Sequence, residues 1–313
     1  MNDIVAGRLL NAAILAPSGH NSQPWKFKVS DDCITIMPDF SRRLYIVDPR
    51  DREIFISVGC AIENICIAAT TVKLKPSVKI NDDDVDITFE KSPDIETSPL
   101  AAFISKRQTN RNMFDNTLIH KSIIDHLTST DAKLYPRGSR EFDIVKSFVK
   151  LGNSIQMKDK DFVNELKEWM RFNEPQSARE LDGLSYDVMG APNMPSWISR
   201  PIMSMMLNAT MQNRSDMRKL QSSPFIAAFD GQDDVPGWIE TGRRLERFLL
   251  IATSHNLACA FINQPCEVEQ LAIELGSQLC LKQNLQLLLR IGHATPAKRS
   301  RRRLLETFII NDA

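Results

Sequence analysis

A polar loop bounded by prolines lies near the start of the chain. It reads APSGHNSQPW, residues 16–25, and carries the polar side chains of Ser18, His20, Asn21 and Gln23. Each proline fixes its own backbone φ angle, so the loop presents these groups on a stiffened frame. A side-chain amide holds both a donor and an acceptor and can pair with the edge of a planar heterocycle, and Asn21 is the first candidate for such a contact. The same residues could instead cap helices and satisfy backbone groups at a helix-to-strand connection.

Closely spaced arginines form a second candidate site. In the segment KRQTNRNMF, the residues Arg107, Thr109 and Arg111 stand two positions apart. Guanidinium forks match the geometry of phosphate oxygens, so two arginines and a hydroxyl suit a small anion. A solvated polar turn between helices would also account for this segment.

A basic run near the C-terminus is followed at once by apolar residues. In AKRSRRRLLETFI, the arginines Arg299, Arg301, Arg302 and Arg303 precede the apolar residues Leu304, Leu305, Phe308 and Ile309. This order favours a tail that docks on the protein over a free arm that binds nucleic acid. The chain has 39 Lys and Arg residues and 39 Asp and Glu residues, so its net charge of zero gives nucleic-acid or anionic-membrane binding no general support.

These three segments resemble motifs of the nitroreductase family. APSGHNSQPW is similar to the family's APSxxNxQPW loop, RQTNRNMF to its RRSxRxF segment, and the arginine tail to its closing basic segment. The resemblance implies an FMN cofactor whose pyrimidine edge meets Ser18 and Asn21, whose phosphate meets arginines, and whose N5 atom faces backbone near Gln264. The cofactor-binding residues that it implies are Pro17, Ser18, Gly19, His20, Asn21, Gln23, Arg107, Gln108, Thr109, Arg111, Gln264, Arg301 and Arg303.

The motifs are divided between two parts of the chain. In the family's homodimers the loop comes from one subunit, and the RRSxR segment and basic tail come from the other, whereas this chain supplies each part once. The arrangement resembles the Acg-type twin-lobed relatives, in which one chain imitates a dimer. We therefore expect an α+β fold of nitroreductase type, with mainly antiparallel sheets flanked by helices and two fused lobes, residues 1–97 and 98–313. One FMN per chain would lie between the lobes. A monomer could then function, and association of several chains into a larger oligomer is also compatible with this arrangement.

An internal repeat agrees with this division. Residues 59–74 align with residues 242–257 at a shift of 242 − 59 = 183 positions. Five aligned pairs are identical: Gly59/Gly242, Glu63/Glu246, Ala69/Ala252, Thr70/Thr253 and Leu74/Leu257. Because the match is short, chance convergence of two buried helices remains the alternative.

Apolar periodicity predicts the elements that position these segments. In the first half it predicts helices up to residue 16 and over 52–74, and strands over 25–29, 33–37, 77–80 and 85–89, with 43–47 as a further piece of the sheet. In the second half it predicts helices over 100–106, 122–129, 140–156, 162–172 and 237–255, and strands over 225–229, 257–262 and 285–291. Residues 91–98 mark the boundary between the halves.

A stretch rich in methionine and proline, residues 182–213, resembles the part of nitroreductases that covers the flavin as a lid. Methionine clusters also serve as filler in cores.

Other classes of protein find less support. The six cysteines show no zinc-ligand spacing, so we expect no metal and no disulfide framework. There is no GxSxG motif for a serine hydrolase. The N-terminus does not resemble a signal peptide, and no run of 18 apolar residues occurs, so we expect a cytoplasmic protein that does not span a membrane.

The resemblance predicts an oxidoreductase in which NAD(P)H reduces the flavin at N5 and the flavin then reduces a nitroaromatic, a quinone or a similar small acceptor. The cofactor carries this chemistry, so no side chain is assigned as a catalytic acid or base. The alternative is a protein that stores FMN under a closed lid without turnover.

Overall fold

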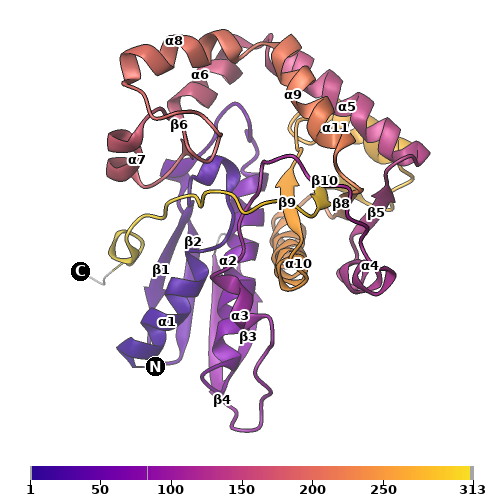
Figure 1. The fold of residues 1–313 in the computed structure, drawn as a ribbon. Helices are drawn as coiled ribbons and strands as arrows, with labels where there is room; N and C mark the ends of the chain where they lie inside the picture. Colours follow the sequence, from indigo (N-terminus) through magenta and orange to yellow (C-terminus); the bar gives the residue numbers. More distant parts are fainter. Residues whose placement is uncertain (1, 83, 311–313) are drawn as a thin grey trace.

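The computed structural model describes residues 2–82 and 84–310. It contains two four-stranded antiparallel sheets, a short parallel pair of strands, and helices that outnumber the strands (Figure 1). The expected α+β class with mainly antiparallel sheets is therefore confirmed.

The first sheet belongs to the N-terminal part of the chain. Its strands are β1 (Trp25–Val29), β2 (Cys33–Pro38), β3 (Leu74–Ile80) and β4 (Val85–Lys91), in the order β1-β2-β4-β3. Trp25 and Phe27 alternate with lysines and are fully buried, which is the period-two pattern of a strand with one face on the core. The helix α1 (Asp3–Ala13) accompanies this sheet and buries Leu9 and Leu10.

The second sheet is built from β5 (Lys133–Pro136), β8 (Phe225–Gly231), β9 (Ala258–Phe261) and β10 (Asn284–Gly292), in the order β5-β8-β10-β9. In β10 every residue after Asn284 is buried. A strand covered on both faces is buried along its length in this way, and here the buried run LQLLLRI is apolar except for Gln286 and Arg290.

Two long helices form the centre of the molecule. They are α2 (Arg52–Thr70) and α10 (Val235–Ser254), which pack against each other between the sheets (Figure 1). By length and composition α2 could span a membrane, but 89% of its apolar window is buried inside the protein, as in the core helix of a folded domain. The Gly59 and Gly242 backbones meet where the helices approach most closely.

The remaining helices and strands connect the sheets or cover one end of α2. Figure 1 shows α6, α7 and α8 as a separate layer at the top of the view. The connecting helices are α3 (Ala101–Ile104), α4 (Lys121–Thr128), α5 (Arg140–Gln156) and α11 (Glu269–Gln278). The covering elements are α6 (Lys160–Glu168), β6 (Met170–Arg171), α7 (Glu174–Glu180), β7 (Leu184–Ser185), α8 (Ser196–Met206) and α9 (Ala209–Gln221). Short 3-10 helices are η1 (Gly19–Asn21), η2 (Phe40–Arg42) and η3 (Leu305–Thr307).

The C-terminal tail docks on the first sheet, as its apolar residues predict. The backbone N–H of Phe27 donates to Phe308 O at 2.8 Å, and that of Ile310 donates to Phe27 O at 2.8 Å. The Phe308 ring is fully buried beside those of Trp25 and Phe27, at centroid distances of 6.4 and 6.3 Å. The tail thus extends the sheet beyond β1.

The predicted strand over residues 43–47 is wrong. This segment follows η2 as turns, and Leu44 and Val47 pack against Phe162 of α6. The N–H groups of Ile46 and Val47 donate to the Glu165 carboxylate, at 3.1 and 2.9 Å. Their hydrogen bonds are therefore satisfied without a neighbouring strand. A partner 118 residues away in the sequence therefore decided this local structure.

Other predicted boundaries also changed. The helix predicted over 162–172 ends at Glu168, because Met170 and Arg171 pair with Leu184 and Ser185 as a small parallel sheet. The strands β5, β6 and β7 and the helices α7, α9 and α11 were not predicted.

Candidate cofactor site

A cavity of about 760 Å³ lies between the polar N-terminal loop, the start of α2 and the covering helices. Its volume falls in the range of roughly 300–1,000 Å³ that is usual for small-molecule and cofactor sites. Its lining includes polar residues, among them Ser18, His20, Arg111 and Gln264. It also includes many methionines: Met157, Met170, Met189, Met194, Met203, Met206 and Met211.

The loop from Pro17 to His20 lines the cavity in an unusual conformation. His20, Asn21 and Gln23 have φ angles of 49°, 57° and 54°, in the left-handed region that non-glycine residues rarely adopt. Hydrogen bonds within the loop hold it, because Ser18 Oγ accepts from the Gln23 N–H at 3.0 Å and Ser18 O accepts from the Asn21 N–H at 3.0 Å. Strained backbone that is held this firmly is typical of ligand-binding sites.

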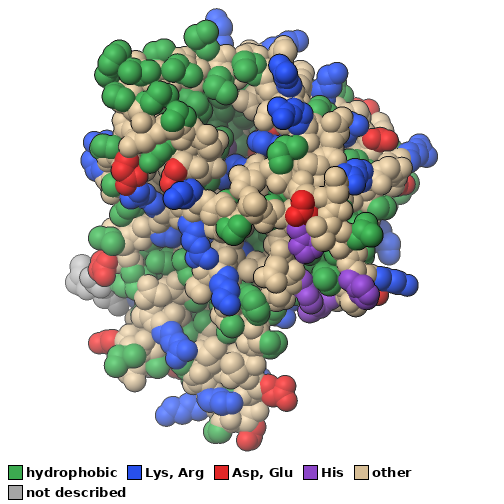
Figure 2. Space-filling model, viewed as in Figure 1, with side chains coloured by type: hydrophobic (Ala, Val, Ile, Leu, Met, Phe, Trp, Pro, Cys, Tyr) green, Lys and Arg blue, Asp and Glu red, His purple; other side chains and the backbone are tan. Residues whose placement is uncertain are grey.

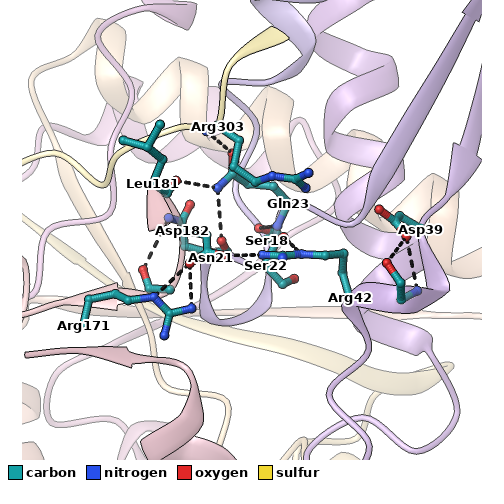
Figure 3. Close-up of polar contacts among 12 residues, drawn as sticks. Ser18, Asn21, Ser22, Gln23, Asp39, Arg42, Arg171, Leu181, Asp182 and Arg303 are labelled. Carbon is teal, nitrogen blue, oxygen red and sulfur yellow. Dashed lines mark hydrogen bonds and ion pairs between the residues drawn. The ribbon is translucent and has the colours of Figure 1, made fainter. Parts of the chain in front are cut away.

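Asn21 and Gln23 anchor the loop from behind and do not line the cavity. The Asn21 amide donates to the carbonyl oxygens of Gly183 and Arg301, at 3.3 and 3.1 Å. The Gln23 amide donates to Leu181 O at 3.0 Å and accepts from the Arg303 N–H at 2.9 Å (Figure 3). The Asn21 side chain, the first candidate for a heterocycle contact, is therefore already used to join the loop to the covering segment and the tail.

An ion cluster reinforces the same junction. Asp182 is contacted by Arg42 and by Arg171, whose Nε donates to Asp182 Oδ1 at 2.9 Å (Figure 3). Arg42 also donates from Nε to Ser22 O at 2.9 Å. Because the Asp182 side chain is 6% exposed, these contacts are poorly screened by solvent and fix the start of the covering segment to the loop.

Four polar groups at the cavity have buried atoms without a hydrogen-bond partner within residues 2–82 and 84–310. They are His20 Nε2, Glu53 Oε1, Arg111 Nη1 and Gln264 Oε1. Leaving a buried donor or acceptor unpaired costs about 1–3 kcal/mol, so such atoms indicate a polar ligand. Burial, and next the charge of Arg111, lower the pKa of His20 to about 4, so its imidazole is neutral at pH 7 and can both donate and accept.

Several cationic side chains line the cavity. Arg111 is joined there by Arg214, Arg218 and Lys219 of α9. Burial lowers the pKa of the Arg111 guanidinium. Burial also lowers the pKa of Lys219, with Arg290 and Arg111 adding to the shift and Asp216 opposing it. A cationic group of this kind suits an anionic ligand group such as a phosphate.

The other predicted arginines lie outside the cavity lining. Arg107 forms an ion pair with Glu246 of α10, Nε to Oε1 at 3.3 Å, and donates to Leu15 O. Arg301 pairs with Glu174 of α7. The Arg303 guanidinium lies over the Phe308 ring at 4.8 Å from its centroid. These three side chains therefore have protein partners.

Arg302 is the tail arginine that faces inward. It donates from Nε to Ile14 O at 2.8 Å, from Nη2 to Ala16 O at 3.1 Å, and from Nη1 to Asn21 Oδ1 at 2.7 Å. Burial, and next the charge of Arg107, lower its pKa to about 9. The tail thus supports the loop and does not enter the cavity. Of the remaining predicted residues, Gln108 has a buried Oε1 without a described partner and Thr109 bridges to Cys259; neither lines the cavity.

Several cavity residues were not predicted from the sequence. Glu53 and Ser57 come from the first turns of α2, Glu267 from the loop before α11, and Lys219 from α9. No sequence signal marked Glu53, because an acidic residue in the first turn of a helix is common where it complements the helix dipole. The basic residues of α9 belong to no motif.

Relatives of the chain agree with the motifs. No family model matches it. Two proteins from Mycobacterium tuberculosis, strains CDC 1551 and H37Rv, are each 26% identical to it over 304 residues, which span 91% of this chain and 84% of each relative. Both are named "Putative NAD(P)H nitroreductase". The chain is thus similar over most of its length to proteins named as nitroreductases.

Solved structures of nitroreductases also resemble this chain, at lower sequence identity. The FMN- and NADPH-dependent nitroreductase NfnB from a Sphigopyxis strain has a TM-score of 0.45 at 13% identity, covering 69% of this chain and 100% of that one. NfnB from Mycobacterium smegmatis, solved with NADPH, also has a TM-score of 0.45, at 10% identity, covering 70% of this chain and 100% of that one.

Proposed function

We propose that the chain binds one FMN in the cavity and uses it, with NAD(P)H as electron donor, to reduce nitroaromatic, quinone or similar small acceptors. The observation that carries the proposal is the set of unpaired polar atoms of His20, Arg111 and Gln264 around one cavity, in a relative of proteins named NAD(P)H nitroreductases. Bound FMN would supply the hydride chemistry, and the protein would supply binding and orientation.

We divide the predicted binding residues into two groups. Pro17, Ser18, Gly19, His20 and Gln264 would contact the flavin ring, and Arg111 with Lys219 would hold the phosphate. The second group would position the first from outside the cavity: Asn21, Gln23, Arg107, Gln108, Thr109, Arg301 and Arg303. The hydrogen bonds of Asn21 and Gln23 to the tail and the covering segment support this division.

We also propose that residues 1–97 and 98–313 are two fused lobes, with the FMN site between them. Each four-stranded sheet lies within one of these ranges. Ser18 comes from the first range, whereas Arg111 and Gln264 come from the second. A monomer of such a chain would hold a complete site. We propose that it works in the cytoplasm and needs neither nucleic acid nor a membrane.

The methionines that line the cavity support a hydrophobic acceptor. Methionine side chains are flexible and polarisable, so they adapt to flat aromatic molecules of different shape. Residues 182–213, which we propose as a lid, contribute Met189, Met194, Met203, Met206 and Met211 to the cavity lining. Figure 2 shows hydrophobic side chains gathered on the outside of the same layer.

The test is reconstitution of the purified protein with FMN, followed by anaerobic addition of NADPH. We expect visible flavin absorbance that NADPH bleaches, and its return when a nitroaromatic or a quinone is added. A protein that cannot be loaded with FMN would overturn the proposal. Bound FMN that NADPH fails to reduce would instead support the alternative function of FMN storage.

A further inference from the structure

Two glutamates line the cavity and have no role in the proposed flavin contacts. Glu53, in the first turn of α2, is 8% exposed, and its Oε1 has no hydrogen-bond partner among the described residues. Glu267, in the loop before α11, accepts at Oε2 from Gln156 Nε2 at 2.6 Å. Both line the cavity, and so does Gln156.

The glutamates lie in a group with excess negative charge. Asp48 stands behind them, where its Oδ2 accepts from the N–H of Glu53 at 2.7 Å and caps the start of α2. The cation beside them is Arg52, whose Nη2 is 3.6 Å from Glu53 Oε1 and which also donates to the carbonyls of Gln286 and Cys266. If all three carboxyls were ionised, one guanidinium would face three carboxylates away from water, which is unfavourable.

The group therefore retains protons near neutral pH. Burial, and next the negative charge of Glu267, raise the pKa of Glu53 to about 7, against the opposing charge of Arg52. Burial likewise raises the pKa of Glu267. The pKa of Asp48 is raised to about 7 by burial and by Glu53. A carboxyl group that holds a proton near the working pH is suited to general acid catalysis.

Glu53 also lies directly against the loop that we propose to hold the flavin ring. A Cβ atom placed on Gly19 would come within 2.7 Å of Glu53 Oε2. Only a residue without a side chain leaves room for this contact. The carboxyl group is thus next to the loop that we propose to contact the flavin ring.

We propose that Glu53 and Glu267 form a proton-donating pair for the acceptor that this cavity reduces. The inference rests on the proposed function and names a side-chain role within it. When a quinone takes a hydride from the reduced cofactor, it gains one proton and two electrons and becomes a hydroquinone anion. The O–H bond of a carboxyl group then breaks, its proton bonds to the anionic oxygen, and the resulting carboxylate regains a proton from solvent.

The experiment compares the acceptor half-reaction in Glu53→Gln, Glu267→Gln and wild-type protein. Each is loaded with FMN, reduced with one equivalent of NADPH and mixed with a water-soluble benzoquinone over a range of pH. In the wild type we expect reoxidation to slow as the pH rises past about 7, the pKa to which Glu53 is raised. In each variant we expect a rate about a hundredfold or more lower at pH 6 and little dependence on pH. Glu269→Gln, an exposed neighbour, should behave as the wild type does.

A second measurement does not depend on activity. Infrared spectra of the FMN-free protein should show a protonated-carboxyl band that fades as the pH passes neutrality and is weaker in both glutamine variants. If wild-type protein does not bind or reduce FMN, the proposed function fails, and the spectra still test proton retention. If FMN is reduced but the variants match the wild type in rate and pH profile, the proton-donating role is overturned. Loss of FMN binding in both variants would also overturn it, in favour of a structural role.

Discussion

Gly59 of α2 and Gly242 of α10 face each other, and each leaves room for the other helix. A Cβ on Gly59 would lie 2.1 Å from Ile239 O, and a Cβ on Gly242 would lie 2.0 Å from Ile56 O. Ile56 and Ile239 are separated by 239 − 56 = 183 positions, as are the two glycines. The contact is therefore self-complementary in the way of a two-fold dimer interface, although both helices belong to one chain.

Replacing either glycine with alanine should destabilise the protein. Because the added methyl group meets backbone on the other helix, the helices must move apart, at a cost of about 1–3 kcal/mol or more. We expect a lower denaturation midpoint for Gly59→Ala and for Gly242→Ala in urea. Gly7→Ala is the matched control, since a Cβ there has no heavy atom within 4 Å, and alanine is favoured in a helix. Equal midpoints for all three variants would show that the close contact is not present.

Arg302 should matter more than its neighbour Arg301. Arg302→Ala removes donors to Ile14 O, Ala16 O and Asn21 Oδ1, so we expect a loss of about 2–4 kcal/mol in the free energy of unfolding and weaker FMN binding. Arg301 pairs with Glu174 at a more exposed site, where such a pair contributes roughly 0–1 kcal/mol. Chemical denaturation and FMN titration of both alanine variants make the comparison. A larger effect at Arg301 would mean that the tail binds in another register.

Arg111 and Arg107 should have different defects. Arg111 lines the cavity with an unpaired Nη1, so Arg111→Gln should weaken FMN binding about tenfold or more with little change in stability. Arg107 is held by Glu246, whose side chain is fully buried, so Arg107→Gln should chiefly lower stability, by about 3–5 kcal/mol. Fluorescence titration with FMN and urea denaturation separate the two effects. If Arg107→Gln instead folds normally and fails to bind FMN, Arg107 is the phosphate ligand after all.

The stability of the FMN-free protein should depend on pH through Glu246. Burial raises the pKa of Glu246 to about 7 from its ordinary 4.5, against the charge of Arg107. Between these pH values the folded protein holds more protons than the unfolded chain, so the free energy of unfolding falls as the pH rises from about 4.5 to about 7. Glu246→Gln should reduce this fall by about 1–3 kcal/mol.

Urea denaturation at several pH values, with exposed Glu269→Gln as the control, measures this difference. His20 contributes the opposite slope between about pH 4 and 6.5, because its pKa is lowered by burial and by Arg111. For this reason the variants must be compared with each other at each pH. An unchanged slope in Glu246→Gln would contradict the assignment.

The sequence by itself determined the features that depend on neighbouring residues. Alternation in Trp25–Val29 and Cys33–Pro38 predicted the first hairpin, and helical spacing predicted α5 over Arg140–Gln156 with both ends correct. The repeat around Gly59 and Gly242 was visible as a match of residue types before the two glycines were seen in contact. Periodicity and turn chemistry act within a few residues, so they can be seen in one chain.

Only the tertiary structure decided which polar side chains face the cavity. Arg107 and Arg111 stand four residues apart in one motif, yet Arg107 pairs with Glu246, 139 positions along the chain, and Arg111 lines the cavity. Glu53 and Glu267 are separated by more than two hundred residues and meet there without any shared motif. A charged side chain is placed by the partners that compensate its burial, and those partners are brought close only when the whole chain has folded.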